Sequence, residues 1–174
     1  MKAVLISIQP KWCELIASGK KTVEVRKTKP KLETPFKVYI YCTKDEPLYH
    51  SGEKFWCKNA GEFGNGKVIG EFVCNAILSH CEMANADIAE QQGLIKRERL
   101  LEYSNGKELY GWHISDLVIY DKPKKLSEFK PYNRTEDDCK YSHLGYAIPK
   151  CSDCHECYVK KPPQSWCYVE EVGR

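Results

Sequence analysis

The chain has 174 residues, 42% of them hydrophobic, and a formal net charge of +3. This length suits one domain with its own core, and so mild a charge does not by itself require a polyanionic partner. No apolar run reaches the ~18 residues that span a bilayer, and the run before Gln9 is too short for a secretion signal. We therefore expect one cytoplasmic domain over residues 1–174, with no membrane contact.

The first elements are a strand and a short helix. Residues 3–8 form an apolar run that predicts a strand, and Pro10 then suits the first position of a helix. Apolar residues from Trp12 onward recur at i, i+3 and i+4, which predicts one buried stripe on a helix over residues 10–18. Gly19 suits the position after the end of this helix.

The stretch GKKTVEVRK (residues 19–27) places charge just after this helix. Its strict alternation predicts a half-buried strand, with Val23 and Val25 on one face and Glu24 and Arg26 on the other. The polar face is either an ordinary solvated face or the floor of a basic, hydrogen-bonding cleft.

The rest of the chain alternates further strands with one helical segment. A helical patch is expected at about 85–103, broken by Gly93, and a long strand follows in ELYGWHISDLVIYDKPKKLSEF. This strand should contain a bulge near Ser115 and Asp116 and end at Pro123. Three other strands are expected, at residues 36–43, 67–80 and 165–172. The sum predicts an α+β fold, a small mixed and mostly antiparallel β-barrel with short flanking helices.

Ten cysteines are unevenly distributed, with five of them in the last 36 residues. Without a secretion signal a disulfide framework is not expected, because the cytosol keeps thiols reduced. Cysteines in apolar strand contexts, such as Cys42 and Cys74, are interpreted as small buried hydrophobic residues.

The sequence CSDCHEC at residues 151–157 contains two successive C-x-x-C spacings, and another cysteine lies twelve residues upstream. Such spacing lets several thiolates close on one ion, and four of them form the tetrahedral shell of a structural zinc. His143 or His155 could replace one sulfur, and the alternative is a group of free surface thiols. We expect one structural zinc in a Cys-rich insert at about 132–160, held by Cys139, Cys151, Cys154 and Cys157.

The stretch SIQPKWCELIASGKKTVEVRK resembles the opening of ASCH domains, a branch of the PUA-like superfamily. The stretches GWHISDLVIYDKPKKLSEF and PPQSWCYVEE also look like the small ASCH proteins of Gram-positive bacteria and their prophages. The resemblance implies a PUA-like β-barrel with a cleft beside the first helix that binds RNA or nucleotides. The Cys-rich insert is not part of the common ASCH core.

In such a cleft the lysines of the GKKT turn would line the mouth, with Glu24 and Arg26 on the floor. Lysine and arginine suit phosphate, a carboxylate accepts hydrogen bonds from base amino groups, and aromatic rings stack on bases. Each residue also has a simpler interpretation: Trp12 could pack in the core, and Glu24 could pair with Arg26. The residues expected to contact nucleic acid are Lys11, Trp12, Lys20, Lys21, Glu24, Arg26, Trp112 and His113.

A second hypothesis is an enzyme that acts on RNA or a modified nucleoside. One branch of the superfamily hydrolyses the acetyl group of N4-acetylcytidine with a lysine of this turn, and the resemblance places Lys21 there, with Glu24 beside it as the other candidate catalytic residue. A lysine with a pKa of ~10.4 needs a lowered pKa to act, and Lys20, Arg26 and burial would all lower it. However, Glu24 replaces a threonine of the hydrolase pattern, and its pairing with Lys21 favours binding over catalysis. Other ASCH proteins have been linked to ribonuclease activity, for which His113 could supply a base.

Overall fold

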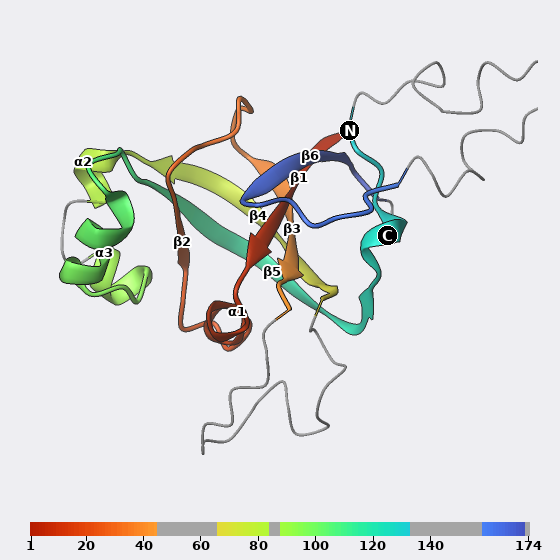
Figure 1. Ribbon diagram of the computed structural model, residues 1–174, viewed down its shortest axis with the longest axis horizontal. Helices are drawn as coiled ribbons and strands as arrows, with labels where there is room; N and C mark the ends of the chain where they lie inside the picture. The colour runs from red at the N-terminus through yellow and green to blue at the C-terminus, as the bar shows by residue number, and fades with distance from the viewer. Residues whose placement is uncertain (45–65, 84–87, 133–157, 173–174) are drawn as a thin grey trace, which may run out of the picture.

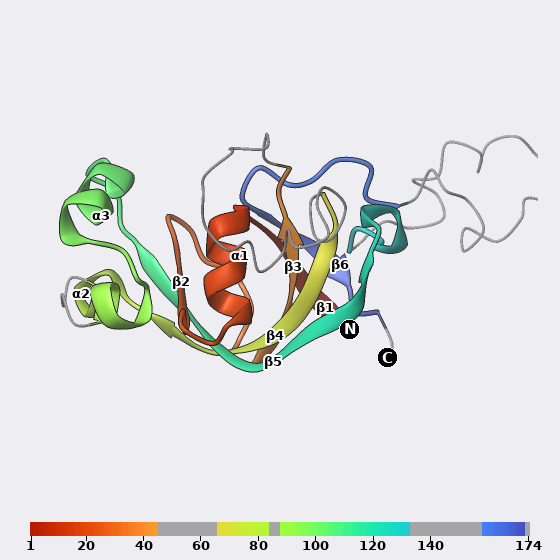
Figure 2. The same ribbon diagram turned by 90° about the horizontal axis from the view of Figure 1, so that it is seen from below.

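One curled sheet organises the molecule, as the computed structural model shows in Figures 1 and 2. The structure describes residues 1–44, 66–83, 88–132 and 158–172. Within these ranges the sheet has six strands in the order β2-β5-β4-β3-β1-β6. The strands are β1 (Lys2–Ile8), β2 (Val23–Arg26), β3 (Phe36–Cys42), β4 (Val68–Leu78), β5 (Tyr110–Lys124) and β6 (Trp166–Glu170).

The sheet is mixed and mostly antiparallel, as predicted, because only β1 and β3 pair in parallel. The predicted β-barrel is found only as a curled half-barrel, because in the described sheet the two edge strands, β2 and β6, are not hydrogen-bonded to each other. Two hydrogen bonds instead tie β6 to the segment after β2. The indole Nε1 of Trp166 donates to Thr28 Oγ1 at 3.0 Å, and the backbone N–H of Lys31 donates to the Tyr168 hydroxyl at 2.7 Å.

The helices are short and lie in two places. Helix α1 (Pro10–Ala17) begins with Pro10 and is followed by Gly19 at φ +71°, as the sequence predicts. It lies on the concave side of the curled sheet, whereas α2 (His80–Met83) and α3 (Arg97–Ser104) lie at one end, beside β2 (Figure 2). A π-helical turn over Ile88–Gln92 precedes α3, so the predicted helical patch is divided near Gly93. A 3-10 turn covers Leu126–Glu128.

Strand β2 is buried on both faces, which corrects the prediction of a half-buried strand. Its Val23 and Val25 pack with Met83, Ala89 and Leu100 of the helical segments in one apolar cluster. The opposite face carries Glu24 and Arg26, which are also buried, and Arg26 donates a hydrogen bond to the Ser7 carbonyl of β1. The polar side chains of β2 therefore lie inside the molecule, and the solvated-face interpretation is wrong.

Strand β5 contains the predicted irregularity but ends later than predicted. Asp116 has φ +47°, and the register with β4 shifts there, since Glu71 pairs with Val118 and Val73 pairs with Ser115. The strand continues through Pro123 to Lys124. Since β2 pairs only with the first residues of β5, the later part of β5 is an edge in the described sheet, where proline is tolerated.

The described cysteines of the first half behave mostly as small apolar residues, as predicted. Cys13, Cys42 and Cys74 are buried in the main core, and burial raises the pKa of Cys74 to about 12. Cys81 is exposed. In the part of the chain that the structure describes, no helix is long and apolar enough to cross a membrane.

Candidate functional site

A cavity of about 980 Å³ lies beside α1 and β2. Its walls come from the end of β1, from α1, from β2, from residues 94–103 and from residues 162–164. Among the described residues, the charged side chains on these walls are five cations and one acid: Lys11, Lys21, Arg26, Lys96, Arg99 and Glu24.

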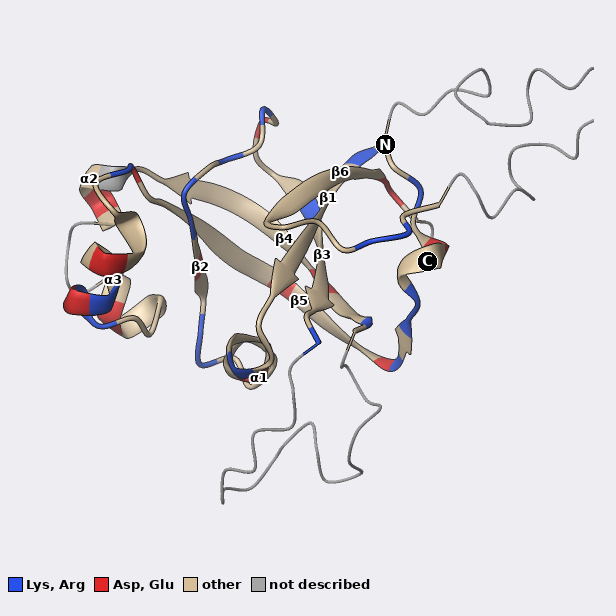
Figure 3. Cartoon of the chain, in the orientation of Figure 1, with Lys and Arg blue, Asp and Glu red and all other residues tan. Residues whose placement is uncertain are grey.

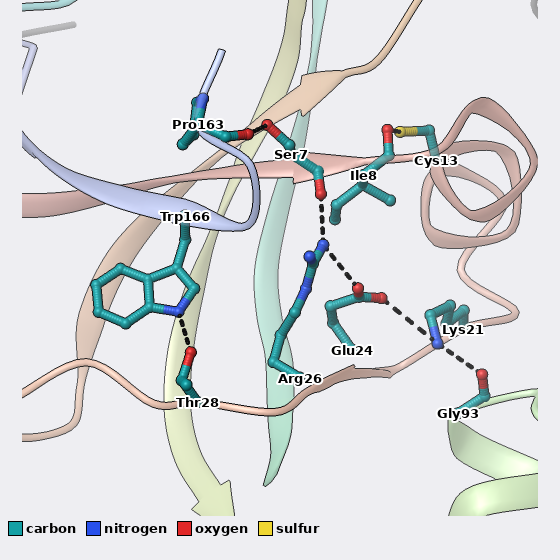
Figure 4. Close-up of polar contacts among 10 residues, drawn as sticks. All are labelled: Ser7, Ile8, Cys13, Lys21, Glu24, Arg26, Thr28, Gly93, Pro163 and Trp166. Atoms are coloured by element: carbon teal, nitrogen blue, oxygen red, sulfur yellow. Dashed lines mark hydrogen bonds and ion pairs between the residues drawn. The ribbon is translucent and has the colours of Figure 1, made fainter. Parts of the chain in front are cut away.

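A row of charged groups crosses one side of this cavity (Figure 4). The ammonium Nζ of Lys21 donates to the Gly93 carbonyl at 2.6 Å and lies 3.5 Å from Glu24 Oε2. Arg26 Nη2 lies 3.0 Å from Glu24 Oε1 and donates to the Ser7 carbonyl at 2.5 Å. Two cations therefore share one carboxylate.

The local structure around α1 and β2 explains this arrangement. The left-handed residue Gly19 reverses the chain after α1, and the backbone N–H of Lys21 then donates to the Leu15 carbonyl at 2.9 Å. The two-residue period of β2 then turns Glu24 and Arg26 to the same inner face. Arg26 is long enough to reach across to β1.

Lys21 is an almost completely buried lysine, with 1% of its surface exposed. Burial lowers its pKa, and the positive charge of Arg26 acts in the same direction, while the nearby Glu24 carboxylate partly opposes both. Its Nζ also lies 5.0 Å from the centre of the Trp12 ring, within the range of a cation–π contact. The cavity thus borders a lysine whose charged form is disfavoured.

Arg26 keeps one donor that the surrounding protein does not use. The residue is 9% exposed, and its Nε is buried without a hydrogen-bond partner among the described residues. An unpartnered buried donor is unfavourable, so the guanidinium is not fully compensated by Glu24 and Ser7.

Among the residues predicted to contact nucleic acid, five line the cavity: Lys11, Trp12, Lys21, Glu24 and Arg26. Trp12 combines both of its interpretations, because its half-buried ring lines the cavity and also packs against the main core. Lys11 is exposed, with Nζ 4.4 Å from the Trp12 ring centre. Lys21 lies in the floor and not at the mouth, and Lys20 is exposed and does not line the cavity.

Trp112 and His113 do not line the cavity, which corrects the prediction that one of them would. Trp112 lies opposite Glu24 in the β2–β5 register, but its ring is fully buried among core aromatics, 5.9 Å from Phe36 and 5.9 Å from Trp166 between ring centres. The next residue of the strand points to the other face, so His113 pairs with Asn75, at 2.7 Å between Nδ1 and Oδ1.

The cavity also contains residues that the sequence did not reveal. Lys96, Arg99 and Tyr103 come from α3 and the residue before it, and Pro162–Gln164 precede β6. The run KRER at residues 96–99 does show that this helical segment carries several cations. Nothing in the sequence indicates which element this helix packs against.

The four predicted zinc ligands, Cys139, Cys151, Cys154 and Cys157, lie outside the described residues, as do His143 and His155. The zinc site therefore stays a prediction. Elsewhere, in the described ranges, no three side chains of the metal-binding types gather at one point.

Comparison with known proteins identifies the family. The family model for the ASCH domain matches residues 6–128. Among solved structures, the ASCH protein from Zymomonas mobilis is similar in fold, with a TM-score of 0.57, 18% identity, and coverage of 97% of this chain and 88% of that chain. A single-residue variant of the same protein has a TM-score of 0.56 and 19% identity, with coverage of 98% of this chain and 92% of that chain. A comparison with curated proteins finds no match. Because the family model covers well over half of the sequence, the chain belongs to the ASCH domain family.

Proposed function

We propose that the cavity beside α1 is a basic cleft that binds RNA or a nucleotide. The observation that carries this proposal is the charge of its floor, where Lys21 and Arg26 share the single carboxylate of Glu24. An excess positive charge held away from water is unfavourable, and an anionic or carbonyl-rich ligand would compensate it.

The walls of the cleft suit the parts of a nucleotide. Trp12 and Tyr103 offer aromatic surface for a base, since base–aromatic stacking tolerates any sequence. Lys11, Lys96 and Arg99 are exposed cations at the same cavity and suit phosphate. The volume of about 980 Å³ is at the upper end of ligand pockets.

The test is equilibrium binding with variants of the exposed cations of the cleft. Lys11→Ala and Arg99→Ala should each weaken binding of a short single-stranded RNA and reduce its salt dependence, because each removes a phosphate partner. Lys20→Ala is the matched control, since Lys20 is also an exposed cation but lies outside the cavity. If all three variants bind as the parent does, the cleft is not the binding site.

A second candidate function is hydrolysis of an acylated nucleoside by Lys21, and the lowered pKa of this lysine favours it. A neutral amine can act as a base or a nucleophile, whereas the Glu24 carboxylate raises the pKa of Lys21 and so partly opposes the neutral form. Incubation with N4-acetylcytidine and related nucleosides, followed by mass spectrometry, separates the two functions. Turnover that is lost in Lys21→Met supports the enzyme, and binding without turnover supports the binding module.

We also propose that Cys139, Cys151, Cys154 and Cys157 hold one structural zinc, on the basis of their spacing alone. Elemental analysis should find one zinc per chain, and Cys151→Ser with Cys154→Ser should remove it. Protein without metal after careful preparation would end this proposal.

A further inference from the structure

We propose that the segment after β2 is a second binding surface, which holds the backbone of a single-stranded nucleic acid beyond the nucleotide in the cleft. This surface consists of Lys27, Lys29 and Lys31 with Tyr103, and we call it the lysine track. It rests on the proposed function, because the track begins where the cleft ends. Its consequence is that a polynucleotide binds more tightly than a free nucleotide, which can occupy the cleft alone.

The track begins directly beside the cleft. Arg26 lies at the cleft floor, and the next residue, Lys27, has its Nζ 4.8 Å from the ring centre of Tyr103. Tyr103 lines the cleft and is 40% exposed. One tyrosine ring thus borders both the cavity and the first lysine of the track, where a base next to the bound one could stack.

The segment is fixed to the protein by its alternate residues. The Thr28 hydroxyl accepts the hydrogen bond from Trp166, Pro30 is buried, and Leu32 packs against the main core. The backbone N–H of Lys31 is held by Tyr168. These contacts place the segment before any ligand arrives, which reduces the entropy lost on binding.

The lysines between these anchors are directed outward. Lys29 and Lys31 are exposed, and Lys29 Nζ lies 5.1 Å from the ring centre of Tyr110. None of the three lysines forms an ion pair with a described residue. Figure 3 shows Lys and Arg on both segments that flank β2. Cations without acidic partners are available for phosphates.

The chemistry favours a nucleic acid over an acidic peptide. An acidic peptide needs only charge, whereas this surface also presents an exposed aromatic ring next to a cavity that can enclose one ring system. Lysine along the backbone with aromatic surface for bases is the usual arrangement for single strands.

The experiment compares a fluorescent single-stranded RNA of about nine nucleotides with a fluorescent mononucleotide, by anisotropy, between about 50 and 200 mM salt. The parent should bind the RNA more tightly than the mononucleotide. The double variant Lys27→Ala/Lys29→Ala should lower the slope of log K against log salt by about 1.4, because each phosphate contact of a single strand contributes about 0.7. The same variant should bind the mononucleotide as the parent does.

The matched control is Lys124→Ala/Lys130→Ala, which removes two lysines that also lie over tyrosines, Tyr120 and Tyr158, but away from the cleft. This control should bind RNA as the parent does. Tyr103→Leu should weaken RNA binding about 5- to 100-fold, while Tyr103→Phe should retain it, because stacking needs the ring and not the hydroxyl.

The failure of this proposal differs from the failure of the proposed function. If the mononucleotide binds but the RNA binds no more tightly, or the two double variants behave alike, the lysine track is overturned and the cleft stands. If the RNA depends on the track but the mononucleotide does not bind, the cleft fails and the track stands. If an oligoglutamate peptide competes as well as RNA does, the surface recognises charge alone and the proposal is overturned.

Discussion

Two buried glutamates of this protein both pair with cationic side chains, but they differ in their relation to the cavity. Glu24 on β2 pairs with Lys21 and Arg26, and Glu71 on β4 pairs with Lys37 at 3.4 Å and accepts a hydrogen bond from the Tyr120 hydroxyl at 2.5 Å. Only Glu24 lines the cavity. A buried charged cluster therefore does not by itself mark a functional site.

The balance of charge separates the two clusters. Lys21 and Arg26 share one acid, whereas Lys37 contacts two, Glu71 and Glu171 at 3.1 Å. The pKa values of the lysines in the two clusters shift in opposite directions. Burial lowers the pKa of Lys21, while the pKa of Lys37 is raised, since its acidic neighbours, with the hydrogen bond to Glu171 foremost, outweigh the effect of burial. The cation-rich cluster can gain from an anionic ligand, whereas the acid-rich cluster has no excess positive charge to offer one.

The largest effect on stability is expected when Glu24, the acid that Lys21 and Arg26 share, is removed. Glu24→Ala leaves two cations without their carboxylate and should lower the free energy of unfolding by about 3–5 kcal/mol, as measured by urea denaturation. Glu71→Ala should cost less, because Lys37 is 19% exposed at its side chain and keeps Glu171. An equal or greater loss in Glu71→Ala would contradict this comparison.

Removal of one hydroxyl should separate stability from binding. Tyr120→Phe deletes the hydrogen bond to the Glu71 carboxylate and should lower the free energy of unfolding by about 1.5–3 kcal/mol. RNA affinity should stay unchanged, because Tyr120 does not line the cavity. A matching loss of affinity at temperatures where the variant is folded would show that the two clusters are coupled.

The lowered pKa of Lys21 predicts a pH effect on stability. Between this lowered pKa and the ordinary value of about 10.4, the unfolded chain binds more protons at this residue than the folded protein does, so its contribution to stability rises with pH. The difference in unfolding free energy between the parent and Lys21→Met should therefore shift in favour of the parent as the pH rises toward the ordinary lysine pKa of about 10.4. Subtraction of the variant removes the titration of cysteines and tyrosines, and a flat difference would contradict the lowered pKa.

The smallest effect should come from Lys20→Ala. This lysine is exposed and does not line the cavity, so the free energy of unfolding should change by less than about 0.5 kcal/mol. RNA affinity should change less than in Lys11→Ala. A larger loss in Lys20→Ala would place the binding surface on the other side of the turn.

The sequence predicted those features that depend on neighbours along the chain. The alternation in β2 placed Glu24 and Arg26 on one face, and Pro10 and Gly19 marked the limits of α1. What depends on packing between distant elements was missed or misplaced. The complete burial of Trp112, for example, results from the way the curled sheet encloses the core.

The residues that α3 and its flank contribute to the cavity were also missed because they depend on packing between distant elements. Lys96 and Tyr103 reach the cavity because the helix lies beside β2, and its own amphipathic pattern does not specify that neighbour. Likewise, Pro123 ended the predicted strand but not the observed one, because the edge position of β5 there is a property of the whole sheet.

The central claim, that the cleft beside α1 holds RNA or a nucleotide, is tested most directly by ultraviolet cross-linking of a bound single-stranded RNA and identification of the linked peptides by mass spectrometry. The cleft presents two aromatic residues from different elements, Trp12 and Tyr103. We predict cross-links in the peptides that contain them. Cross-links confined to the far tyrosines, such as Tyr120 and Tyr158, would contradict the claim and place the nucleic acid elsewhere on the molecule.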